Sequence, residues 1–169
     1  MTRTAGLAIG VVVDVSDPQG EGRVLLRYPD LPEEPMGAWT PIAAAMAGNG
    51  KGAFFMPEPG DEVLVGFHRG STDAPYVVGF LHNGVDRPPE SDAQNRVFVT
   101  RTGHSLRFED GNKKVILKSG GGRTVTLDDN TGTITVETGG TSIRIDGSSI
   151  TLLGGGRQLT MSGGSVAIT

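Results

Sequence analysis

TVTLDDNTGTITVETGGTSIRIDGSSITL, residues 124–152, is the stretch that decides the fold of this chain. Two apolar residues separated by one polar residue recur along it, and each pair is followed by a turn that contains Gly, Asp or Asn. Alternation with a period of two is typical of a β-strand that buries one face. The stretch therefore predicts a series of short strands joined by tight turns.

The same unit extends from His104 to the end of the sequence. The first members of successive pairs lie seven to ten residues apart, which makes the unit an internal repeat. The pairs are Leu106/Phe108, Val115/Leu117, Val125/Leu127, Ile134/Val136, Ile143/Ile145, Ile150/Leu152, Leu159/Met161 and Val166/Ile168.

A strand of about five residues presents only two apolar side chains inward, too few for a core of its own. A single-chain solenoid needs coils of roughly 20 residues, whereas three chains wound together need one short strand per chain in each layer. We therefore expect an intertwined, trimeric β-helix over residues 104–169, a stiff rod with an apolar axis. The expected trimer core is Val115, Leu117, Val125, Leu127, Ile134, Val136, Ile143, Ile145, Ile150, Leu152, Leu159 and Met161.

Residues 1–85 have the pattern of a small barrel, so the chain as a whole is expected to be all-β. Five strand candidates separated by turn residues favour an OB-like barrel, and the Gly-rich segment 44–53 is expected to be irregular. The candidates are residues 7–15, 23–28, 38–43, 62–67 and 76–81. Residues 86–103, polar and Pro-containing at their start, are expected to form a linker and transition.

Composition excludes several classes of function. The chain has no Cys, so it has no disulfides, thiolate nucleophiles or Cys-ligated zinc, and oligomerisation is the expected source of extra stability. The net charge is −4 and neither half has a basic patch, so we expect no nucleic-acid partner. No signal peptide or membrane-length apolar run is present, which predicts synthesis in the cytoplasm.

Candidate chemical sites have simpler interpretations. The carboxylates of residues 58–62 surround a Pro-Gly turn. Residues 48–52 lack the spacing of a phosphate loop, and residues 128–132 begin like a calcium loop but have Gly139 where the bidentate Glu belongs. The three His residues are far apart in sequence, with no catalytic constellation around them. We expect no catalytic site, no cofactor and no metal.

Several segments carry a resemblance to a known family. They are RVLLRY at 23–28, WTPIA at 39–43, AGNGKGAFFMPEPGDEVLVGF at 47–67, DAPYVVGFLHNGVDRPPE at 73–90 and RTGHSLRF at 101–108. In this order they resemble the OB domain, and the transition into the β-helix, of phage baseplate assembly protein V and the valine-glycine repeat proteins of type VI secretion.

The resemblance implies a homotrimeric central spike of a contractile injection machine, assembled into a baseplate and driven through a target envelope. It also implies a hub protein at the barrel and a PAAR-type cap at the needle tip. Because the sequence begins almost at the barrel, we expect the hub to be a separate polypeptide. No His follows His104, so a metal-sharpened tip is not expected.

The last strand, Ser165, Val166, Ala167, Ile168 and Thr169, is the expected docking surface for the cap, because it would end the prism with unpaired backbone groups. A trimeric adhesive or glycan-binding tail fibre is the alternative function. That class uses exposed aromatic platforms, whereas the repeats contain only Phe108. A cell-wall hydrolase would need a pair of catalytic carboxylates that the sequence does not offer. The sequence is equally compatible with a phage, a bacteriocin particle and a secretion system as the machine.

Overall fold

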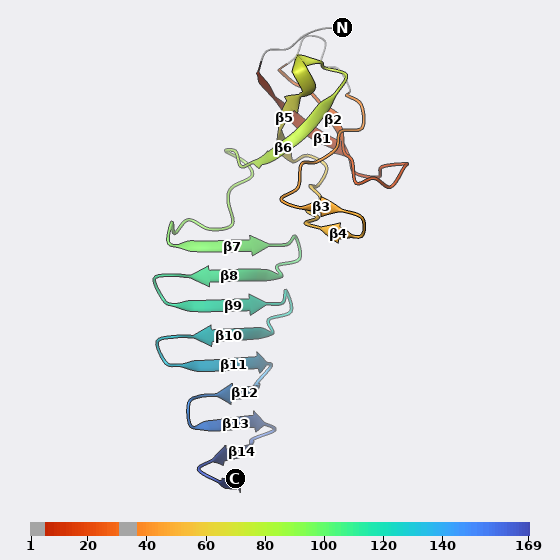
Figure 1. Ribbon diagram of the computed structural model, residues 1–169. Helices are drawn as coiled ribbons and strands as arrows, with labels where there is room; N and C mark the ends of the chain where they lie inside the picture. The colour runs from red at the N-terminus through yellow and green to blue at the C-terminus, as the bar shows by residue number, and fades with distance from the viewer. Residues whose placement is uncertain (1–5, 31–36) are drawn as a thin grey trace. The chain divides into compact units, whose positions relative to one another are not determined.

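The computed structural model describes residues 6–30 and 37–169. Its regular structure is β, apart from one 3-10 turn, η1, at His68–Gly70. The chain divides into two compact units, Met1–Arg87 and Pro88–Thr169 (Figure 1). The all-β class expected from the sequence is confirmed for the described residues.

The first unit is built on a four-stranded antiparallel sheet. Its strands are β1 (Leu7–Asp14), β2 (Leu25–Arg27), β5 (Glu62–Phe67) and β6 (Pro75–Leu81), in the order β2-β1-β5-β6. Alternate residues of β1 and β5 are buried, as the period-two pattern of these apolar segments requires.

Two isolated bridges close this sheet into a barrel. Thr40 pairs with Val24 at the β2 side, and Ile42 pairs with Val77 of β6. The backbone N–H groups of Val24 and Thr40 each donate to the carbonyl of the other, at 2.9 and 2.7 Å. The segment expected as a strand at 38–43 thus forms two bridges instead, and these bridges join the two outer strands of the sheet.

The core of the first unit lies inside this barrel. Gly10 allows close packing there, because a Cβ at this position would lie 3.1–3.3 Å from side-chain carbons of Val65, Leu26 and Val63. The buried apolar residues are Ala8, Val12, Val24, Leu26, Tyr28, Val63, Val65 and Val77.

A small hairpin projects from the Gly-rich segment. Strands β3 (Ala47–Gly48) and β4 (Lys51–Gly52) pair with each other and with no other described strand. The sequence-based expectation of an irregular segment at 44–53 was wrong here. Gly50, with a φ of 66°, adopts the left-handed conformation that the tight turn requires.

The second unit is a nine-stranded antiparallel sheet in which every strand pairs with its neighbours in sequence. Figure 1 shows these strands stacked in chain order. They are β7 (Asn95–Val99), β8 (Ser105–Glu109), β9 (Lys114–Lys118), β10 (Thr124–Asp128), β11 (Thr133–Thr138), β12 (Thr141–Ile145), β13 (Ser149–Gly154), β14 (Arg157–Ser162) and β15 (Ser165–Ile168).

Two features of this sheet differ from the sequence-based expectation. Successive strands hydrogen-bond to each other within one chain, so they form one meander and do not pass from face to face of an intertwined helix. The sheet also begins earlier than residue 104, because Asn95–Val99 of the expected linker pairs in full register with β8. In β7, Arg96 occupies the position of the first apolar residue of a pair. The repeat pattern therefore did not identify this strand from the sequence.

Candidate assembly surface

The ladder register places the apolar pairs of the second unit in two unbroken columns on one side of the sheet, here called the apolar face. Directly paired residues of an antiparallel sheet project to the same side. The first column is Phe98, Leu106, Leu117, Val125, Val136, Ile143, Leu152, Leu159 and Ile168. The second is Phe108, Val115, Leu127, Ile134, Ile145, Ile150, Met161 and Val166.

The opposite side, here called the polar face, has a central column of a different composition. Thr and Arg dominate it, with Val97, Ile116 and Ala167 as its apolar members. Its other members are Arg107, Thr126, Thr135, Arg144, Thr151 and Thr160. The two sides of one sheet are therefore suited to different environments.

Most of the apolar face is exposed in the single chain. Twelve of its seventeen apolar side chains have relative exposures of 37–77%, and none of the seventeen is buried. The only buried residue described in the second unit is Thr133, on the polar face. Such a continuous apolar surface indicates a site of association.

All twelve residues of the sequence-predicted trimer core lie on the apolar face, six in each column. The structure thus brings them into one surface. Phe98 extends the first column by one strand and was missed from the sequence, because Arg96 occupies the other position of its pair. Leu106 and Phe108 extend the columns at the same end.

The predicted tip residues form the free edge of this sheet. Strand β15 pairs with β14 alone among the described strands, and Val166 and Ile168 are 66% and 77% exposed. Thr169 continues the ladder, since its N–H donates to the carbonyl of Gln158 at 2.9 Å and its carbonyl accepts in return at 2.8 Å. The outer side of β15 remains unpaired.

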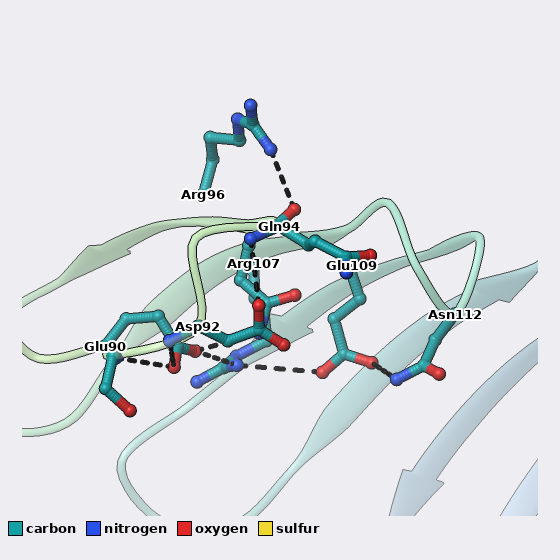
Figure 2. A network of polar contacts seen from close by, with 9 residues as sticks. Glu90, Asp92, Gln94, Arg96, Arg107, Glu109 and Asn112 are labelled. Carbon is teal, nitrogen blue, oxygen red and sulfur yellow. Dashed lines mark hydrogen bonds and ion pairs between the residues drawn. The ribbon is translucent and has the colours of Figure 1, made fainter.

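A polar network fixes the segment before β7 to the polar face (Figure 2). The Glu90 carboxylate accepts hydrogen bonds from the guanidinium of Arg107, from the Asn95 side-chain amide at 3.0 Å and from the N–H groups of Ser91 and Asp92. Arg107 also lies 3.7 Å from the carboxylate of Glu109. The Asp92 N–H, then the Asn95 amide and the Ser91 N–H, hold the pKa of Glu90 at about 2, with a further contribution from Arg107. This segment therefore leaves the apolar face uncovered.

Carboxylates also organise the turns of the sheet. Asp146 accepts hydrogen bonds from the N–H and hydroxyl groups of Ser148 and Ser149, and these donors lower its pKa to about 2. The ammonium group of Lys114, 3.1 Å away, lowers the pKa of Asp128. The Asp146 contacts stabilise the turn between β12 and β13, and the Lys114–Asp128 ion pair joins facing ends of β9 and β10.

The barrel has an apolar surface of its own. A groove of about 410 Å³ and another of about 590 Å³ share Phe55, Met56 and Phe80 as lining residues. Phe54 and Phe80 are 75% and 50% exposed, because outward positions of β6 and of the segment after β4 carry large apolar side chains. Val78 extends this surface along β6.

The other candidates from the sequence remain scattered. Asp61 closes the 58–62 turn by accepting from the Glu58 N–H at 2.8 Å. His68 lies edge-on to Tyr76, and Nδ1 of His104 accepts from the Gly120 N–H. Among residues 6–30 and 37–169, no three His, Cys, Asp or Glu side chains are grouped as metal ligands would be. The same residues include no helix with the length and apolarity to cross a membrane.

The described residues thus form a small β-barrel and, later in the chain, an antiparallel sheet with an exposed apolar face. Residues 8–82 match the family described as the type VI secretion system/phage-baseplate injector OB domain, and the match covers most of the barrel.

Similarity also extends to a curated protein, the type VI secretion system spike protein VgrG3 of Vibrio cholerae serotype O1. The two sequences are 27% identical over an alignment that covers 63% of this chain, more than the OB-domain match accounts for. The chain spans about an eighth of that relative's length, since the alignment covers 13% of it. The expected resemblance to phage baseplate and type VI spike proteins is thereby confirmed.

Proposed function

We propose that this chain is a structural central spike of a contractile injection baseplate, in which three copies of the second unit form a needle and the barrel anchors it. The observation that carries the proposal is the pair of unbroken apolar columns on an exposed face. The family of the barrel and the similarity to a spike protein support the same role.

The dimensions of the sheet favour three copies. A strand of five residues is about 17 Å long, and a triangular prism with walls of that width has its axis about 5 Å from each wall. That distance is half of the ~10 Å by which packed sheets are separated. The Ile, Leu and Val side chains of three apolar faces would therefore fill the axis without leaving a channel.

Burial of the apolar face supplies the driving force. Ile143 is 40% exposed in the single chain, and covering the rest of such a side chain stabilises by roughly 1 kcal/mol. Repeated over the exposed members of both columns, this amounts to something on the order of 10 kcal/mol per chain before the entropy of association is subtracted. We therefore propose a prism of three meanders in place of the intertwined helix expected from the sequence.

The barrel would bind the baseplate hub through the surface around Phe54, Val78 and Phe80. The proposal is supported by the exposure of these side chains and by the two grooves that meet at Phe80. The partner would present apolar side chains that fit these grooves, with polar groups at their rim.

The unpaired side of β15 would be covered by a PAAR-type cap. The exposure of Val166 and Ile168 supports this assignment, because a bare strand edge promotes end-to-end association. We propose that the spike pierces an envelope mechanically, with no catalytic step and no cofactor.

Light scattering of the purified full chain tests the central claim. A trimer has a mass of about 53 kDa, three times the 17.6 kDa of one chain. A folded protein with the mass of one chain would contradict the proposal.

Two capture experiments test the partners. Phe80→Glu should abolish capture of the baseplate hub, whereas Leu7→Glu, an exposed apolar residue that lines neither groove, should leave it intact. A chain that ends at Gly164 should lose capture of the tip protein, and undiminished capture would remove residues 165–169 from that interface.

A further inference from the structure

The two lateral edges of the nine-stranded sheet carry opposite charge. One edge, here called the basic edge, consists of the turns that join β7 to β8, β9 to β10, β11 to β12 and β13 to β14, with the adjoining strand ends. It has four basic residues and one acidic residue, namely Arg101, Lys118, Arg123, Arg157 and Glu137.

The other edge, here called the acidic edge, consists of the turns that join β8 to β9, β10 to β11, β12 to β13 and β14 to β15, with the adjoining strand ends. It has five acidic residues, Glu109, Asp110, Asp128, Asp129 and Asp146, against Lys113 and Lys114. Some of this charge is compensated within the chain, since Arg96 binds Asp110 at 2.9 Å and Lys114 binds Asp128 at 3.1 Å.

Strand β10 carries this asymmetry most clearly. Arg123 immediately precedes the strand, and Asp129 immediately follows it. Both are exposed, and neither the Arg123 guanidinium nor the Asp129 carboxylate has an ion-pair partner among the residues that the structure describes. About 20 Å of extended chain separates them, so they do not neutralise each other within one chain.

Three-fold symmetry determines which edges meet. If three identical sheets turn their apolar faces inward and run in the same direction, each corner of the prism joins the basic edge of one copy to the acidic edge of the next. Like edges never meet in such an arrangement. The charge pattern of a single chain therefore fits a second copy of that chain.

We infer that the corners of the trimer are held by complementary charge, with Arg123 of each copy facing Asp129 of its neighbour. This inference rests on the proposed trimer and adds to it the contact that fixes the order and height of the chains around the axis. Opposite charges at the corners favour this alignment, because slipping one chain along the axis takes Arg123 away from Asp129.

A double-mutant cycle on the full chain tests the inference. The variants are Arg123→Glu, Asp129→Lys and the combined Arg123→Glu/Asp129→Lys. Arg144→Glu is a matched control, because it makes the same change at the centre of the polar face. The measured quantity is the rate of subunit exchange between labelled and unlabelled trimers at low ionic strength.

We expect each single reversal to accelerate exchange roughly tenfold or more, because three corners change together and each exposed pair alters an equilibrium by about two- to fivefold. The combined variant should exchange within about threefold of the unmodified protein, since it restores opposite charges at every corner. Added salt should reduce the differences between the variants. Arg144→Glu should exchange as the unmodified protein does.

Within one chain the two positions are too far apart to couple, so recovery in the combined variant would come from contact between copies. Two results would contradict the corner contact while leaving the proposed trimer intact. In the first, the exchange rate of the combined variant equals the product of the two single effects. In the second, Arg144→Glu accelerates exchange as much as Arg123→Glu does. If the unmodified chain is not a trimer, the proposed function fails and this inference fails with it.

Discussion

The barrel and the sheet use the same alternating pattern with opposite results. In the barrel, alternate apolar residues of β1 and β5 are buried within one chain, and Val63 and Val65 have no exposed surface. In the sheet, alternation is just as regular, yet Ile143 and Val136 remain about 40% exposed. The difference arises from closure, because bridges at Thr40 and Ile42 let one chain surround its own core. A meander forms a single layer, so another chain or segment must cover its apolar face.

Separating the two units is the most drastic test of this comparison. The fragment Met1–Arg87 has its own core and should fold as a monomer, whereas Pro88–Thr169 should be a trimer or fail to fold. Light scattering and circular dichroism of both fragments measure this. A trimeric barrel fragment would show that assembly does not depend on the apolar face.

A carboxylate on the apolar face should nearly abolish assembly. Ile143→Asp would place three charges together in the dry axis of the proposed prism, at a cost of several kcal/mol per chain. Thr135→Asp, at the centre of the polar face of the adjacent strand, is the matched control and should cost little. Equal melting temperatures for the two variants would mean that the inward and outward faces have been misassigned.

A cavity in the barrel should have a smaller and strictly local effect. Leu26→Ala removes a fully buried side chain and should destabilise the barrel by about 2–5 kcal/mol. Denaturant titration of Met1–Arg87 measures this loss. In the full chain, Leu26→Ala should leave the trimer mass unchanged. If the Leu26→Ala trimer dissociates, the stability of the barrel and the assembly of the sheet are coupled, contrary to our expectation.

The smallest effect concerns the segment fixed by Glu90. Because its pKa falls to about 2 in the folded chain from an ordinary value of 4.5, its ionised form contributes stability above pH 4.5 that is lost as the pH falls towards 2. Glu90→Gln should therefore lower the melting temperature at pH 7 and match the unmodified protein near pH 2.

If the melting temperatures of Glu90→Gln and the unmodified protein differ by the same amount at every pH, an ionic role for Glu90 is excluded.

Alternation along the sequence was sufficient to predict which residues share the apolar face. The pairs Val125/Leu127 and Ile134/Val136 were recognisable because strand geometry is local and the turns between them contain Gly and Asp. Their alignment into columns follows from short turns, which leave little freedom of register.

Other features depend on contacts that alternation does not encode. The barrel closes through single bridges at Thr40 and Ile42, and one bridge leaves no periodic signal. The β3–β4 hairpin contains Gly at positions where propensity opposes a strand. The ion pair between Glu90 and Arg107 joins residues 17 apart in sequence, and its partners could be identified only once β7 and β8 were seen to pair.

The meander also determines how quickly such a structure can form. Among the described residues, each strand of the sheet pairs only with the strands next to it in sequence, so β9 pairs with β8 and β10. Local pairing lowers the contact order, and individual hairpins form within microseconds. Encounter of three chains is then the slow event, and the rate at which the assembled state appears should rise steeply with protein concentration during refolding.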